Sequence, residues 1–70
     1  MDKKEFELLV RERDTHIEKL IQAKRDLARL KKLQLRTLLQ EQELLTAQKI
    51  VDDELTQIAM LDERLASAAD

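Results

Sequence analysis

The side chains best suited to binding chemistry form a row of basic residues near the middle of the chain. Four of them recur at intervals of four, three and four residues and would share one face of a helix: Arg25, Arg29, Lys32 and Arg36. Such a row can contact the phosphates of nucleic acid or of an anionic membrane surface. Proteins that make either contact usually carry aromatic residues on the binding face, and Phe6 is the single aromatic in this sequence. We therefore expect a solvated flank that meets an acidic helix, with phosphate contact as the less favoured alternative.

Two other groups of residues could hold a cation, and both patterns are weak. Glu12 and His16 lie four residues apart and would be neighbours on a helix, but two ligands do not make a metal site. The run Asp52–Glu54 would spread its carboxylates around a helix, since consecutive helical residues point about 100° apart. The pattern predicts no metal site, and His16 is expected on the flank of a helix contact.

The residues needed for catalysis are also scarce. Nucleophilic catalysis needs an activated Ser, Thr or Cys beside a base, and the chain has one serine, Ser67, one histidine and no cysteine. Glycine, which lets a loop approach a phosphate closely, is missing from the composition. We expect no catalytic residues, no cofactor and no small-molecule substrate.

Composition indicates the elements that must position these side chains. The 70 residues lack Gly and Pro, 40% are charged, and Leu, Glu, Lys, Arg, Gln and Ala, all strong helix formers, dominate. The sequence predicts an all-α fold, with residues 1–70 as one helical segment. No apolar run approaches the roughly 20 residues of a membrane span, and the mixed-charge start resembles no secretory signal, so a cytoplasmic location is expected.

Apolar residues repeat with coiled-coil spacing along two lines. The first runs through Phe6, Ile17 and Leu27 and contains Arg13 and Lys24 as polar members. These two could cover apolar neighbours with their stems, or could control the register of pairing. The second line repeats every seven residues, and a leucine-rich middle, expected to hold the strongest contacts, separates the two. The candidate interface residues are Phe6, Val10, Ile17, Leu20, Leu27, Leu38, Leu39, Leu44, Val51, Leu55, Ile58 and Leu65.

The two lines do not share one register, which leaves two topologies open. A continuous helix with a local stammer is favoured, because Gly, Pro and Asn, the usual residues of tight turns, are all missing. The alternative is a helical hairpin broken near residues 34–37, where Thr37-Leu38-Leu39-Gln40 matches a capping box that could start a second helix. A second match begins at Thr15, inside the first line, and shows how easily this pattern arises by chance.

Charge favours antiparallel packing in either topology. Residues 15–36 carry seven basic and two acidic side chains, whereas residues 37–70 carry two basic and eight acidic ones. Parallel partners in register would place like charges side by side, and antiparallel partners would place the basic segment beside an acidic one.

These features predict a non-catalytic assembly or adaptor subunit that acts through coiled-coil contacts with protein helices, in a homo-oligomer or a hetero-complex. The alternative is a small chaperone-like hairpin that shields an amphipathic client helix. Contact of the basic row with nucleic acid or membrane ranks below both.

Overall fold

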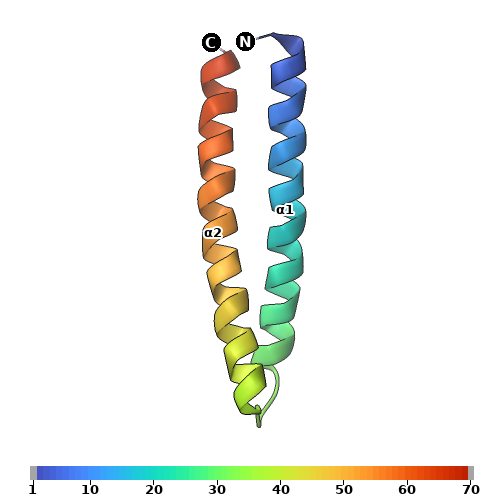
Figure 1. Cartoon of the computed structure of the whole chain (residues 1–70), viewed down its shortest axis with the longest axis vertical. Helices are drawn as coiled ribbons and strands as arrows, with labels where there is room; N and C mark the ends of the chain where they lie inside the picture. Colours follow the sequence, from blue (N-terminus) through green and yellow to red (C-terminus); the bar gives the residue numbers. More distant parts are fainter. Residues whose placement is uncertain (1, 70) are drawn as a thin grey trace.

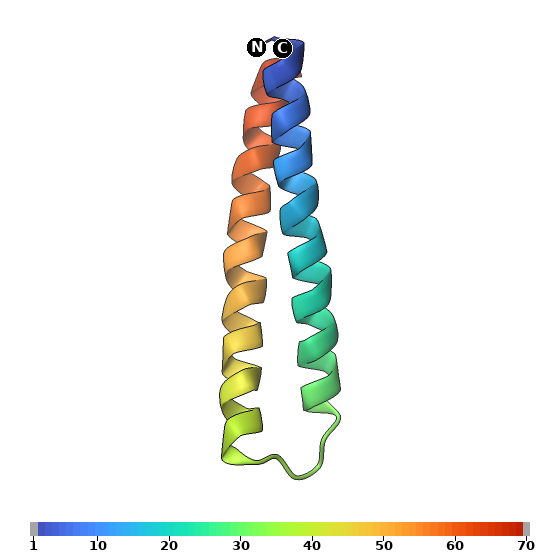
Figure 2. The same ribbon diagram turned by 45° about the vertical axis from the view of Figure 1, so that its right-hand side comes forward.

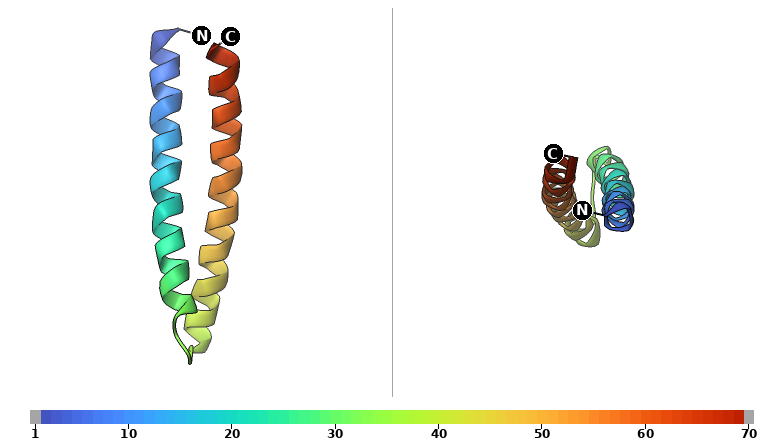
Figure 3. Two further views of the ribbon diagram at one scale, coloured as in Figure 1. Left: turned by 180° about the vertical axis from the view of Figure 1, so that it is seen from behind. Right: turned by 90° about the horizontal axis from the view of Figure 1, so that it is seen from above.

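The chain folds into an antiparallel helical hairpin (Figure 1). The structure, a computed structural model, describes residues 2–69, and within that range the regular structure is two α-helices, α1 at Lys3–Lys31 and α2 at Leu38–Ala69. The helices lie side by side in a body of 52 × 15 × 14 Å, with the start of α1 and the end of α2 at one end and the connection at the other (Figures 1, 2 and 3). The predicted all-α fold and its antiparallel packing are confirmed. The favoured continuous helix is wrong, and the hairpin alternative is correct.

The chain reverses over residues 32–37 without any of the usual turn residues. Within the described residues every φ angle is negative, so the reversal needs no glycine and is spread over several positions instead. Helix α1 ends where the Lys32 N–H donates to the Ala28 carbonyl at 3.2 Å. Arg36 then bridges the two helices. Its Nε donates to Glu41 Oε1 at 2.7 Å and its Nη1 to the Leu30 carbonyl at 3.4 Å.

Both helices begin with a side chain that caps their first free amides. The Asp2 carboxylate accepts from the Glu5 amide at 2.9 Å and starts α1. At the start of α2 the Thr37 hydroxyl accepts from the Gln40 amide at 3.1 Å, and the Gln40 side chain accepts from the Thr37 amide at 2.9 Å. This reciprocal pair is the predicted capping box. The second sequence match is no cap, because the Thr15 hydroxyl donates back to the Arg11 carbonyl inside α1.

The helices pack along one seam whose residues alternate three and four apart on each helix, as in a coiled coil. Leu30 is the most deeply buried side chain, with 1% of its surface exposed. Leu20, Ala23 and Val51 form the cluster at the centre of the seam. All seam residues are buried or half-buried: Leu9, Arg13, His16, Leu20, Ala23, Leu27 and Leu30 of α1, and Leu44, Ala47, Val51, Glu54, Ile58, Leu61 and Leu65 of α2.

The α1 side of the seam shares every second residue with the first predicted line. At the positions between them, the seam residue is the one just before the predicted residue. The predicted line placed Lys24 in the contact, but Lys24 is exposed and Ala23 is buried in its place. Residues three and four apart lie on the same helix face, so the spacing alone could not choose between the two positions. Ala23 provides no bulky side chain for a sequence pattern to detect, yet it lets α2 approach closely.

Candidate protein-interaction surface

The seam contains a polar section toward the open end of the hairpin. The Nδ1 atom of His16 pairs with Glu54 Oε2 across the seam, and both side chains are largely buried. One turn earlier on α1, Arg13 Nη1 donates to Asp62 Oδ1 at 3.3 Å. Among the described residues, the Nε atom of Arg13 is a buried side-chain nitrogen with no hydrogen-bond partner. These contacts join the helices through polar side chains, whereas the other half of the seam is apolar.

In the polar section, His16 lies differently from what the sequence predicts. His16 pairs with Glu54 of the other helix instead of with Glu12 of its own, and it lies in the seam instead of on its flank. The three carboxylates of Asp52–Glu54 point in different directions, as predicted: Glu54 lies in the seam, and Asp52 and Asp53 are exposed. Across residues 2–69, His, Asp and Glu side chains form no group of three that could hold a metal ion.

The basic row predicted over residues 25–36 does not form one helix face. Helix α1 ends at Lys31, so Lys32 and Arg36 belong to the connection, and Arg36 is half-buried in its bridge to Glu41. Arg29 lies 4.0 Å from Asp26 of the same helix. The prediction of a continuous row is therefore wrong, because it assumed that the helix extends through Arg36.

Over the described residues, neither helix has a stretch long and apolar enough to cross a membrane.

The candidate interface residues divide into two groups in the hairpin. One group packs in the seam or on its edges: Val10, Ile17, Leu20, Leu27, Leu44, Val51, Ile58 and Leu65. The other group is exposed: Phe6, Leu38, Leu39 and Leu55. The sequence pattern missed four buried core residues: Ala23, Leu30, Ala47 and Leu61. Leu30 belongs to the leucine-rich middle, and Ala47 and Leu61 flank the second predicted line. Ala23 lies beside Lys24 of the first line, and its small side chain does not mark a helix face.

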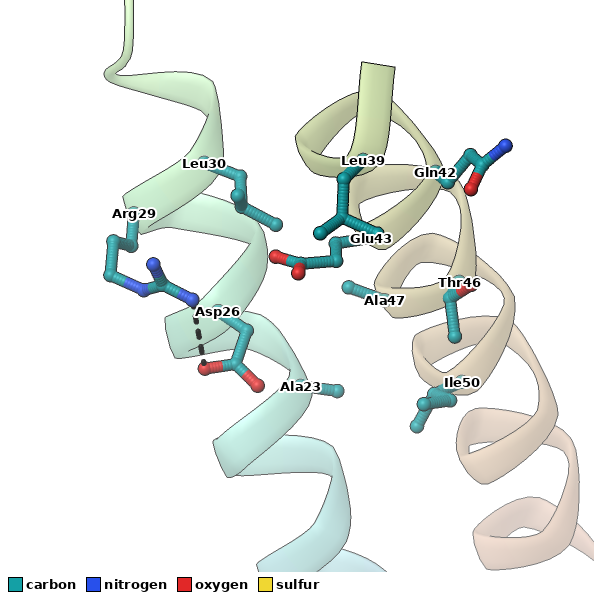
Figure 4. A pocket seen from close by; sticks show the side chains of 10 residues that line it. All are labelled: Ala23, Asp26, Arg29, Leu30, Leu39, Gln42, Glu43, Thr46, Ala47 and Ile50. Carbon is teal, nitrogen blue, oxygen red and sulfur yellow. Dashed lines mark ion pairs between the residues drawn. The ribbon is translucent and has the colours of Figure 1, made fainter. Parts of the chain in front are cut away.

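An open groove of about 400 Å³ lies on one side of the hairpin near the connection (Figure 4). Figure 4 shows Leu30 and Leu39 directed toward each other from the two helices, with Ala23 and Ala47 farther along the groove. Its polar lining includes the Arg29–Asp26 pair and the carboxylate of Glu43. The mixed charge and open shape favour water over a specific ligand.

The opposite side of the hairpin, which we call the lateral face, carries several bulky apolar residues among polar ones. Because the helices are antiparallel, residues that directly follow equivalent seam positions turn to the same side on both helices. Ile17 and Leu55 follow the paired seam residues His16 and Glu54, so they border the seam together. Ile21 and Leu45 directly follow the seam residues Leu20 and Leu44 and lie on the same side, farther around each helix from the seam. The apolar residues of the lateral face are Val10, Ile17, Ile21, Leu38, Leu45, Leu55, Ala59 and Ala66. Polar side chains follow most of the other seam positions and lie between them: Asp14, Lys24, Lys31, Gln48, Asp52 and Asp62.

Most of the lateral face is open to solvent in the isolated hairpin. Leu45 is 70% exposed, and Ile21, Leu38 and Leu55 are also exposed. Single exposed apolar residues are ordinary, but several bulky ones on one side of two packed helices are suited to packing against a further helix.

Comparisons with protein-family models, with curated proteins and with solved structures find no match for this chain.

Proposed function

We propose that this chain is a helical assembly subunit, which acts by packing its lateral face against helices of a protein partner and performs no catalysis. The observation that supports the proposal is the division of apolar residues in the hairpin. One set closes the seam between α1 and α2, while the lateral face, with Leu45 and Leu55 exposed, has no covering element within the described chain.

The mechanism follows from ordinary helix packing. The two helices present bulky apolar side chains with charged residues among them, and a third or fourth helix can pack against them with its own apolar residues. Apolar contact supplies the affinity, and the charged residues select the orientation of the partner. The one histidine, which could act as a general base, is instead paired with Glu54 in the seam.

Photo-crosslinking in the cell of origin tests this proposal directly. The photo-reactive amino acid p-benzoylphenylalanine replaces Leu45 on the lateral face in one variant and Thr56, which is exposed on α2 away from the seam, in a control. The proposal predicts an adduct of one defined mass from position 45 and a much weaker one from position 56. Equal or missing adducts at the two positions would contradict it.

The shielding alternative has one supporting observation, the polar section of the seam. Arg13, His16 and Glu54 replace apolar seam residues there, so this part of the hairpin is held by weaker contacts and could open to admit a client helix. A shielding protein would show fast amide exchange in residues 9–20 when alone and slow exchange with client. An assembly subunit would keep those amides protected in its complex throughout.

A further inference from the structure

We infer that the lateral face is occupied by a second copy of this chain, and that two hairpins pack antiparallel into a four-helix bundle with their connections at opposite ends. This inference rests on the proposed function and names its partner.

The first reason is the amount of surface that the hairpin leaves exposed. The chain has a solvent-accessible surface of 5630 Å² at a mass of 8.2 kDa, whereas a compact monomer of that mass exposes about 4,500 Å². The excess of roughly 1,100 Å² is of the same size as the roughly 800 Å² that each partner contributes to a standard protein interface. A second hairpin along the full length of the lateral face would cover an area of that order.

The second reason is the position of the apolar residues along the hairpin. Ile17 and Leu55 lie near the middle of α1 and α2, close to where a two-fold axis of an antiparallel dimer would pass. Such an axis brings the same residues of both copies together at the centre. The bulky Leu38 and Leu45 lie toward the connection, and in the dimer they would face the open end of the other hairpin.

The residue sizes at the two ends fit that arrangement. Toward the open end, the lateral face carries the small Ala59 and Ala66 on α2. An antiparallel dimer therefore sets large side chains of one hairpin against small ones of the other, as close packing of a bundle core requires. A parallel dimer would set leucine against leucine near the connection and alanine against alanine at the open end.

The third reason is the charge along the axis of the hairpin. The half near the connection, residues 20–52, carries seven basic and four acidic side chains. The half at the open end, residues 2–19 and 53–69, carries six basic and ten acidic ones. Two copies in opposite directions place the basic half of each beside the acidic half of the other. Exposed charge pairs contribute little affinity, so this pattern chooses the direction and the apolar face holds the copies together.

Substitutions at two equally exposed positions test which face is used. Leu55 on the lateral face and Met60 on the groove side are each 47% exposed in the hairpin. In chromatography with light scattering, Leu55→Glu is expected to raise the dimer dissociation constant by about 30-fold or more, the loss typical of a central interface residue. Met60→Glu should leave the dimer intact, and circular dichroism should show both variants helical. A dimer equally sensitive or insensitive to the two changes would overturn the inference.

The direction of packing is tested by a distance between the two connections. The sequence has no cysteine, so Gln34→Cys in the connection gives a single site for a spin label. Pulsed electron resonance on the labelled dimer should report an inter-label distance near the 52 Å length of the hairpin. A short distance would indicate parallel packing, and a missing dipolar signal would indicate a monomer, and either result overturns the inference.

The two proposals fail in different ways. If the chain is monomeric but position 45 crosslinks to one different protein, the homodimer is wrong and the assembly function stands. If position 45 forms no defined adduct and the chain is monomeric, both are wrong.

Discussion

At the scale of single residues, the seam combines deep apolar contacts near the connection with polar contacts in its other half. Leu30 is almost completely buried near the connection, while His16 and Glu54 meet in the other half of the hairpin. An apolar pair in place of these two largely buried side chains would pack more favourably, since buried polar groups lose hydration that their contact only partly returns. The polar pair instead fits one alignment of α1 on α2, because a shift of either helix would separate the two side chains.

A double-mutant cycle on His16 and Glu54 measures whether their contact outweighs the cost of burying them. His16→Leu and Glu54→Leu should each lower the melting temperature, because each leaves the other charged or polar group in the seam without its partner. The double variant should melt above the wild type, by an amount equivalent to about 1–4 kcal/mol. Thermal denaturation followed by circular dichroism provides all four values, and a double variant less stable than both singles would contradict this assignment.

Two leucines near the connection, one buried and one exposed, show how much burial contributes to the free energy of unfolding. Leu30 is 1% exposed and Leu35 is 92% exposed. Leu30→Ala should cost about 2–5 kcal/mol, because it removes buried methyl groups and leaves a cavity. Leu35→Ala should cost less than about 0.5 kcal/mol. Chemical denaturation of the two variants checks the difference, and similar losses would show that Leu30 is not the central contact.

At the scale of the elements, the sequence predicts where α2 begins better than it predicts that the chain reverses. The capping box at Thr37 and Gln40 is a local pattern with a local geometry, and it forms as expected. Missing glycine and proline favour a continuous helix, but residues 32–37 turn the chain at negative φ angles, and Arg36 connects the two helices by hydrogen bonds to Leu30 and Glu41. These contacts belong to no standard turn motif, so the sequence pattern does not predict the reversal.

The two capping-box matches provide a matched pair of substitutions. Thr37→Ala removes a cap that the structure uses and should cost about 1 kcal/mol, which for a domain of this size corresponds to roughly 4–8 °C in melting temperature. Thr15→Ala lies inside α1, where alanine is the better helix former, and should leave the melting temperature unchanged or slightly higher. Equal effects of the two changes would contradict the assigned cap.

At the scale of the whole molecule, two helices of this length enclose a narrow core and leave a second apolar surface uncovered. The sequence already indicated helix partners through its leucine-rich middle, but it could not tell which leucines pack within the chain. Leu44 lies in the seam and Leu45 lies on the lateral face, although the two are adjacent. Only the register of α2 against α1, set by contacts such as His16–Glu54, decides between them.

Sedimentation velocity of the unmodified chain over a micromolar dilution series tests the central claim most directly, because it reports mass and shape together. We expect one species at twice the 8.2 kDa chain mass, with the low frictional ratio of a compact bundle. It should dissociate only at the lowest concentrations. A monomer at every concentration, or a dimer with the frictional ratio of an extended rod, would contradict the account.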